Sequence, residues 1–535
     1  MKLLISKQPL ALLIVITLLS ISNGQYECNS LNCVLPNCNC KSSNIPHGLS
    51  KDVVPQLVMI TFDDAVTTDN YETYNHLMTG ITNPNGCPIS ATFFVSHEYT
   101  DYKTVQQLHS QGHEIASHSI SHRFPPSWWQ TANYTDWYSE IQGQREMLST
   151  WAHIDKSEIK GMRAPFLQPG GNWQFQIISD LKRDGFKYDA SLVSYIHKID
   201  PYAPPIWPYT LDFPSVDDCG VKPCPDWTFR GLWEIPLVEY EDKDGTLCAM
   251  LDECDAARSE EELYNVIMKN FENHYNTNRA PFGIYMHSPW LKNPSNFNVV
   301  RRFMQDIATR GDVWFVSQSK VLDWIQSPKT LQSMDTFSSF NCWLHRSPWV
   351  CTDDQSITCV YDTSGFLVWP RRISKRNAVY PKTNISTVLD QEYFNRQQAR
   401  ATRKMKLWSQ STGLNFPGRT TEALYNDATP SYDYGEAYGV YYNGQSEPGF
   451  IPYPKPNEDG NHQEGYYSEE SGTPEREAGD AKLTSNLLAS ILGPKNKARI
   501  GVSRKKRQSN TFHELHICSE YCPFRYPWLN NIDGQ

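Results

Sequence analysis

The chain has 535 residues, of which 39% are hydrophobic and 20% charged, and its formal net charge at pH 7 is −10. It is longer than one ordinary compact domain and too polar to be packed throughout, so we expect a folded domain joined to a polar extension. The negative charge gives no support for binding to nucleic acid, and the 14 cysteines are typical of an oxidising compartment.

The first 24 residues have the pattern of a secretory signal peptide. Lys2 and Lys7 lie beside an apolar run over residues 10–19, which is too short to span a bilayer, and small or polar residues follow at 22–24. We therefore expect secretion, with a mature chain that begins near Gln25. A membrane anchor is the alternative, but polar residues 20–25 argue against it, and no later run in the sequence is long and apolar enough to span.

The cysteines are unevenly spaced. Residues 25–50 form a Cys-rich N-terminal segment with four cysteines, eight more are scattered from Cys87 to Cys359, and a late pair stands at Cys518 and Cys522. The set up to Cys359 and the late pair are both even in number, so full pairing within each set is an available arrangement. A zinc–thiolate cluster of the first four is the alternative, which a secreted location disfavours. Glycosylation acceptor sequences at residues 133–135 and 384–386 fit the same route.

From residue 57 to residue 325, short apolar runs rich in β-branched residues alternate with amphipathic helical patterns. The strand-like runs are residues 57–62, 91–96, 114–117, 160–163, 232–239, 283–286 and 312–317. Apolar residues recur at four-residue spacing within 263–271 and 299–307, which indicates helices. This alternation predicts an α/β fold, and six or more such units favour a barrel with its site at the carboxyl ends of the strands. We place this domain at residues 51–360.

Residues 361–535 are predicted to form a low-complexity, acidic, Tyr-rich tail that is partly disordered. Residues 432–480 are rich in Tyr, Gly, Glu, Pro and Asn, with almost no aliphatic residues. A basic run at 504–507 is most simply a solvated patch. It also resembles a furin-type processing site, so a proprotein convertase that cuts after Arg507 is a predicted partner.

Two adjacent carboxylates stand at the end of the first strand. Asp63 and Asp64 follow the apolar residues 57–60, in the position where an α/β protein keeps its active site. Neighbouring aspartates repel each other, so a cation or a proton is expected beside them. A simple turn is the alternative, since Asp is common in loops.

Two histidines follow the strand at 114–117. His118 and His122 are four residues apart, a spacing that allows both imidazoles to reach one ion from the same side. Together with one carboxylate they would form the two-histidine, one-carboxylate set of open catalytic metal sites. A chance surface pair is the alternative for an isolated motif of this kind.

Two more strand ends carry polar residues of chemical interest. Arg163 lies in the sequence GMRAPF at 161–166, where a buried guanidinium could orient a carboxylate, and His287 ends the strand-like run at 283–286. A surface ion pair and a core histidine are the alternatives for each residue alone. Four such elements at strand ends of one barrel-like chain favour a common site.

These four motifs resemble, in the same order, those of the polysaccharide deacetylases of carbohydrate esterase family 4, the NodB homology group. The resemblance covers residues 57–325. Segments 33–40, 207–212, 231–236 and 313–316 look like those of arthropod chitin deacetylases, although this chain has too few N-terminal cysteines for a six-cysteine chitin-binding module. The resemblance implies a distorted (β/α) barrel and a divalent metal, which is Zn²⁺ or another such ion, for example Co²⁺.

The resemblance also assigns roles around the metal. Asp64, His118 and His122 would bind the ion, and Asp63 would be the general base that activates water for attack on an acetamide. Arg163 would hold and orient Asp63.

The remaining roles concern the leaving group and the substrate. His287 would be the general acid, and the family pairs this histidine with a carboxylate, for which Asp212 is the candidate. A backbone N–H near Phe166 would stabilise the oxyanion. Trp233 resembles a groove-wall residue, with a core tryptophan as the alternative.

The sequence therefore predicts a secreted deacetylase that converts chitin or chito-oligosaccharides to chitosan and acetate, without a nucleic-acid or membrane partner. The alternative is a catalytically silent chitin-binding matrix protein, which such intact residues disfavour. An acetyl-xylan or peptidoglycan deacetylase is a third interpretation. Asp217 and Asp218 stand where arthropod relatives carry a histidine, so we expect a cleft of different charge.

Overall fold

The computed structural model describes residues 27–194, 196–200, 202–214, 219–254, 259–342, 350–362, 364–372 and 513–535. All of them belong to one compact unit. The predicted signal peptide, Asp217 and Asp218, the Asn384 sequence and the basic run at 504–507 lie outside the described residues.

The central element is a nine-stranded sheet in the order β12-β1-β2-β3-β4-β5-β8-β7, with β13 also paired to β1. Its strands are β1 (Gln56–Asp63), β2 (Thr92–Val95), β3 (Glu114–Ser117), β4 (Gly161–Met162), β5 (Tyr188–Asp189), β7 (Tyr209–Thr210), β8 (Trp233–Glu234), β12 (Phe282–His287) and β13 (Val313–Phe315). All pairings are parallel except that of β7 with β8. The carboxyl ends of the parallel strands therefore meet at one edge, which we call the site end.

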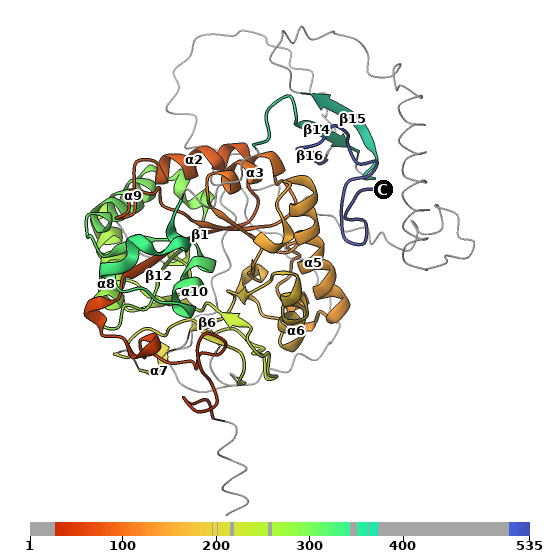
Figure 1. The fold of residues 1–535 in the computed structure, drawn as a ribbon. Helices are drawn as coiled ribbons and strands as arrows, with labels where there is room; N and C mark the ends of the chain where they lie inside the picture. The colour runs from red at the N-terminus through yellow and green to blue at the C-terminus, as the bar shows by residue number, and fades with distance from the viewer. Residues whose placement is uncertain are drawn as a thin grey trace, which may run out of the picture. The chain divides into compact units, whose positions relative to one another are not determined.

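Helices cover this sheet on the outside, as Figure 1 shows for α2, α3, α5, α8 and α9 around β1 and β12. They are α2 (Thr68–Met78), α3 (Tyr102–Ser110), α4 (Ser127–Thr131), α5 (Tyr134–Trp151), α6 (Asn172–Asp180), α7 (Ile196–Ile199), α8 (Glu260–Asn276), α9 (Pro294–Ala308) and α10 (Gln318–Gln326). Each long helix begins with a side-chain cap or a favourable residue; Asn133, for example, accepts hydrogen bonds from the amides of Thr135 and Asp136 at the start of α5.

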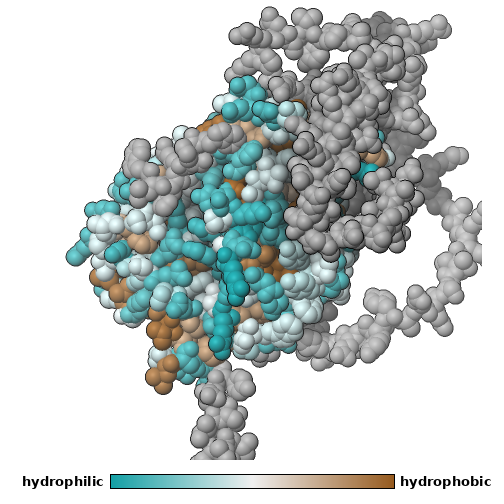
Figure 2. Space-filling view, turned by 45° about the vertical axis from the view of Figure 1, so that its right-hand side comes forward, coloured by the Kyte–Doolittle hydropathy of each residue, from teal (hydrophilic) through white to brown (hydrophobic). Residues whose placement is uncertain are grey.

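The burial pattern explains why the strands read as continuous apolar runs. Every residue of β1 is buried, as expected for a parallel strand covered on both faces. On the face shown in Figure 2, hydrophobic residues form small patches scattered among hydrophilic ones. The apolar side chains are therefore mostly inside, between the sheet and the helices.

The predicted α/β class with a distorted barrel is confirmed, with two local differences. Residues 232–239, predicted as one strand, form β8 and then β9 (Leu237–Val238), which pairs instead with β6 (Val193–Ser194). Pro236 lies between them and offers no N–H to a ladder. Within the described chain, the edge strands β12 and β7 do not pair with each other, so the barrel is an open, curled sheet.

Smaller sheets flank the barrel. Strands β10 (Tyr240–Glu241) and β11 (Leu247–Cys248) form a hairpin, and β14 (Ile357–Tyr361) pairs with both β15 (Leu367–Arg372) and β16 (His513–Ile517). Residues 513–535, which the sequence assigns to the tail, thus form part of the described unit. We call them the C-terminal segment.

All fourteen cysteines are paired in seven disulfides. They are Cys28–Cys40, Cys33–Cys38, Cys87–Cys342, Cys219–Cys224, Cys248–Cys254, Cys351–Cys518 and Cys359–Cys522. Pairing within the two sets is therefore wrong for the late cysteines, since both of them bond to cysteines of the earlier set. The four N-terminal cysteines are disulfide-bonded, so they offer no thiolate to a zinc cluster. None of the described helices is long and apolar enough to cross a bilayer.

Candidate metal and catalytic site

The site begins where β1 ends. Asp63 is the last residue of β1 and lies in register with His287, the last residue of the neighbouring strand β12. Side chains at equivalent positions of adjacent parallel strands point to the same face, so these two residues emerge together at the site end. Asp64 follows with a φ of 81°, an uncommon backbone conformation for a residue other than glycine, and one that clusters at functional sites.

Asp64, His118 and His122 form a cluster that suits a divalent metal. Their ligand atoms lie within 4.8 Å of one another. The Asp64 Oδ1 atom is 3.8 Å from Nε2 of His118 and 3.3 Å from Nε2 of His122. His118 Nδ1 lies 2.8 Å from the carbonyl oxygen of Arg163, which can only accept, so Nδ1 is the donor and Nε2 is the nitrogen that faces Asp64.

The electrostatics of the cluster agree with a ligand role. Burial lowers the pKa of His122 to about 4 and outweighs the opposing effect of the Asp64 carboxylate, so this imidazole is neutral near pH 7. Two neutral imidazoles and one carboxylate form the donor set that zinc and similar ions accept. The residues present therefore fit a divalent cation.

Asp63 belongs to a different contact network. Arg163 Nη1 donates to Asp63 Oδ1 at 2.7 Å and to Thr61 Oγ1 at 2.8 Å, while Arg163 Nε donates to the carbonyl oxygen of Ala190 at 2.9 Å. The arginine side chain is fully buried, with its guanidinium over the ring of Phe94 at 4.2 Å. Asp63 is thus oriented by a buried guanidinium.

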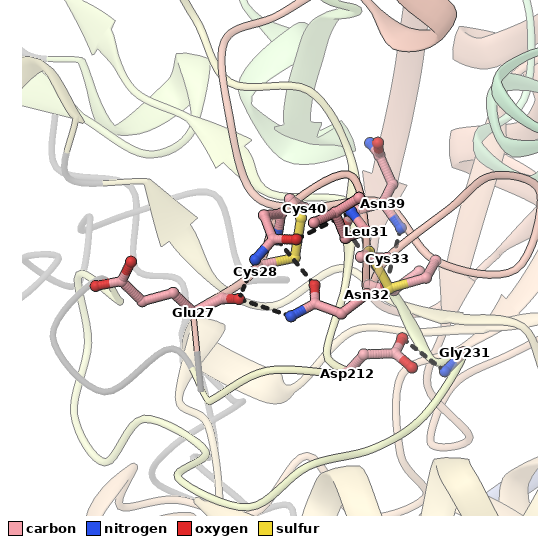
Figure 3. Close-up of a disulfide and its surroundings, with 12 residues drawn as sticks. Glu27, Cys28, Leu31, Asn32, Cys33, Asn39, Cys40, Asp212 and Gly231 are labelled. Atoms are coloured by element: carbon pink, nitrogen blue, oxygen red, sulfur yellow. Dashed lines mark hydrogen bonds between the residues drawn. A yellow bond between two sulfur atoms is a disulfide. The ribbon is translucent and has the colours of Figure 1, made fainter. Parts of the chain in front are cut away.

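His287 is paired with Asp252, not with Asp212 as predicted. Asp252 Oδ2 accepts hydrogen bonds from both Nδ1 and the backbone N of His287, at 2.8 and 2.7 Å. Burial disfavours the charge on His287, but the carboxylate of Asp252, together with those of Asp64 and Asp63, outweighs it and raises the pKa to about 10. Asp212 instead accepts from the backbone N of Gly231 at 2.9 Å, beside the N-terminal disulfides, as Figure 3 shows. Asp252 lies inside the short loop closed by Cys248–Cys254, and this cysteine-bounded carboxylate was the signal that could have identified it.

The loop that carries the two histidines is supported by a residue that the motifs do not reveal. Glu140 of α5 is 1% exposed, and its Oε2 accepts from the amides of Ile120 and Ser121 at 2.8 and 2.9 Å. Its Oε1 accepts from the Ser121 hydroxyl. Ser119 and His122 have φ values of 70° and 42°, so this carboxylate holds a loop with an uncommon backbone. A glutamate among buried residues of an amphipathic helix was the available sequence signal.

The two predicted substrate residues lie in different surroundings. The ring of Phe166 is 36% exposed and its centroid is 4.5 Å from that of His122. Phe166 also has a left-handed backbone, with a φ of 58°. Trp233 is 3% exposed at the start of β8 and lines a hollow with Asn37 and Asp212, so its place is that of a core residue away from the site end.

A family model described as polysaccharide deacetylase matches residues 50–188. Chitin deacetylase 8 of Bombyx mori is 41% identical over 305 residues, which cover 56% of this chain and 78% of that protein. Chitin deacetylase 1 of the same species is 36% identical over 349 residues, which cover 61% of this chain and 63% of that protein. Among solved structures, the chitin deacetylase from Colletotrichum lindemuthianum has 14% identity and a TM-score of 0.29, and the match covers 50% of this chain and 88% of that one.

Proposed function

This chain belongs to the polysaccharide deacetylase family, and we propose that it is a secreted, metal-dependent enzyme that removes N-acetyl groups from chitin or chito-oligosaccharides. The products would be chitosan and acetate. One observation carries the proposal: the Asp64, His118 and His122 cluster lies with two separate proton-handling pairs, Asp63–Arg163 and His287–Asp252, at the same end of the sheet. The substrate class follows the two Bombyx mori relatives, which are named chitin deacetylases.

In this proposal Asp64, His118 and His122 hold the divalent cation, which we take to be Zn²⁺, with Co²⁺ as a substitute. When bound, such an ion polarises the substrate carbonyl and lowers the pKa of water. His118 is already oriented for this role through its hydrogen bond to the Arg163 carbonyl.

Asp63 acts as the general base. It takes a proton from the water molecule that attacks the acetamide carbonyl carbon. Arg163 orients this carboxylate, since the guanidinium is fully buried and donates to Oδ1 at 2.7 Å. A backbone N–H near Phe166 is the proposed donor to the developing oxyanion.

His287 acts as the general acid. As the C–N bond breaks, it donates a proton from Nε2 to the departing sugar nitrogen, which leaves as the amine. Asp252 fixes Nδ1 as the other N–H and raises the pKa of the ring, so the protonated form is the resting one at neutral pH. The proposed base Asp63 and the proposed acid His287 lie in register on the neighbouring strands β1 and β12, so both can serve the same substrate amide.

The route to the extracellular space remains part of the proposal. Seven disulfides fit an oxidising compartment. The signal peptide and convertase cleavage after Arg507 are predictions for residues outside those that the structure describes.

The decisive experiment is acetate release from chito-oligomers by the purified secreted protein. We expect release that a chelator abolishes and added zinc restores, with acetylated xylan a poor substrate. A folded, metal-loaded protein that releases no acetate but binds chitin would contradict the proposal and support the silent matrix protein. Faster acetate release from acetylated xylan or peptidoglycan than from chito-oligomers would keep the deacetylase and replace chitin as its substrate class.

A further inference from the structure

Four exposed aromatic side chains form a continuous row on the surface. Tyr138, Tyr134, Trp173 and Trp227 are 44, 37, 41 and 45% exposed. Their ring centroids are 6.3 Å apart for Tyr138 and Tyr134, 6.1 Å for Tyr134 and Trp173, and 5.3 Å for Trp173 and Trp227. We call this row the aromatic ledge. Exposed aromatics that gather in this way usually mark an interaction surface.

The ledge lies at the site end of the barrel. Helices that follow parallel strands run back along them, so each begins near the carboxyl end of the strand before it. Tyr134 and Tyr138 lie in the first turns of α5, which follows β3 and the histidine loop. Trp173 lies in the first turn of α6, which follows β4, Arg163 and Phe166.

The ledge is also pre-organised and joined to the catalytic segment. Trp227 belongs to a loop clipped by the Cys219–Cys224 disulfide. Asn172 Oδ1 accepts from the backbone N of Trp227 at 3.0 Å, which fixes the two indoles against each other. Gln168, two residues after Phe166, donates to the carbonyl oxygen of Lys222 at 2.7 Å. A path of fixed residues thus leads from His122 through Phe166 to the ledge.

We propose that the aromatic ledge binds the part of an acetylated polysaccharide chain that extends beyond the sugar undergoing hydrolysis. Pyranose rings have apolar C–H faces that pack on aromatic planes, and their hydroxyl and amide groups need acceptors beside them. The ledge offers both, because the carboxylates of Asp180 and Asp226 lie at its edge, bonded to Tyr134 and Asn172. This inference rests on the proposed function, and it gives the enzyme a preference for longer chains.

The rival occupant is a glycan of the chain itself. Asn133 stands directly before Tyr134 in an acceptor sequence, and its side-chain oxygen is used as the cap of α5. A glycan there would lie beside the same rings. Thr135→Ala removes the acceptor sequence and leaves the cap in place, so it separates the two occupants.

The test compares Trp173→Ala and Trp227→Ala with the wild type on a chito-dimer and a chito-hexamer. Tyr202→Ala, which removes a 95% exposed ring elsewhere, is the matched control. We expect KM for the hexamer to rise about fivefold to tenfold in each Trp variant, with kcat and the kinetics on the dimer unchanged. Retention of the chelated, metal-free protein on chitin beads should fall in the same variants.

The outcomes separate this inference from the proposed function. The ledge proposal would be overturned if the ratio of KM for the dimer to KM for the hexamer were the same in the Trp variants and the wild type. Equal losses of activity on dimer and hexamer would overturn it too, and neither result would affect the proposed enzyme. Loss of the Trp effect in the Thr135→Ala background would assign the ledge to the chain's own glycan and also overturn it. A protein that releases no acetate yet needs both tryptophans for bead binding would keep the ledge and refute the enzyme.

Discussion

The histidine loop, residues 118–122, and the C-terminal segment, residues 513–535, are held in opposite ways. The loop contains no cysteine, and its main side-chain support is one buried carboxylate, that of Glu140. The C-terminal segment is fastened by Cys351–Cys518 and Cys359–Cys522. The geometry of the proposed metal site therefore rests partly on hydrogen bonds that a single substitution can remove. The last residues, in contrast, are attached through two disulfides to cysteines far away in the sequence.

The two regions meet at His97 and Gly143. His97 donates its backbone N–H to the carbonyl oxygen of Ile120 at 3.4 Å, and its ring Nε2 lies 2.8 Å from the carbonyl oxygen of Pro527. A Cβ on Gly143 would lie 2.7 Å from the Ile120 side chain and 3.3 Å from that of Ile532, so the bare backbone of α5 lets both approach. The C-terminal segment thus packs behind the loop that carries the two proposed metal-binding histidines.

Asp63→Asn should have the largest effect on activity, because it removes the proposed general base and leaves the proposed metal ligands in place. We expect kcat to fall by roughly 10² to 10⁴-fold, the usual contribution of a general base, while the protein retains metal. Asp64→Asn is the matched comparison and should lose metal together with activity. Metal content by atomic spectroscopy and acetate release together check the pair. Equal metal loss in both variants would contradict the division of roles.

Glu140→Ala should weaken the metal site without touching a ligand. Two backbone amides and one hydroxyl would lose their buried acceptor, and we expect metal affinity to fall by about 10 to 100-fold, as for other residues that support ligands. Competition with a chelator measures this directly. Glu146→Ala, on the same helix, removes an ion pair with Lys156 and a hydrogen bond from Gln142, neither of which involves the histidine loop, and is the control.

Glu140→Gln refines the same prediction. It keeps an oxygen that accepts hydrogen bonds, so it should recover part of the affinity. If Glu140→Ala lowers the melting temperature but leaves metal affinity unchanged, then Glu140 stabilises the fold and does not position the loop.

Asp252→Asn should change the pH dependence more than the fold. His287 works as an acid only while protonated, so activity is lost as pH rises through its pKa. Among the three carboxylates that raise that pKa to about 10, Asp252 contributes most, and Asn carries no charge to do so. We therefore expect the basic limb of the kcat/KM profile to move to lower pH, whereas Asp212→Asn should leave it in place. An unmoved basic limb in Asp252→Asn would show that this pair does not set the limb.

The sequence predicted the elements whose signal is local. Strands β1, β2, β3 and β12 are long enough to show an apolar run, and Asp63, His118 and His287 stand directly at or after their ends. The two-residue strands β5 and β7 are too short to produce a pattern. Their pairing depends on where the neighbouring strands lie in the folded sheet, which local propensity does not encode.

The parts that sequence did not predict depend on long-range packing. Which carboxylate meets His287 is decided by the loop that passes over the end of β12, and the Cys248–Cys254 clip brings Asp252 there rather than Asp212. The late cysteines bond to partners 163 and 167 residues away, a choice that parity in number cannot decide. Glu140 acts through backbone amides, so its only sequence signal is a glutamate among the buried positions of a helix, which does not say what the carboxylate contacts.

The smallest effect on activity is expected from cleavage of the chain itself. If a convertase cuts after Arg507, the two disulfides beyond that point should keep the C-terminal segment attached behind the histidine loop. The cut protein should then run as one species on a non-reducing gel and release a short fragment only after reduction, with acetate release unchanged. Arg507→Ala should give no fragment under either condition. A fragment that separates without reductant would contradict the disulfide pairing. A single band after reduction of the wild type would dismiss the processing and leave the pairing to be checked by peptide mapping.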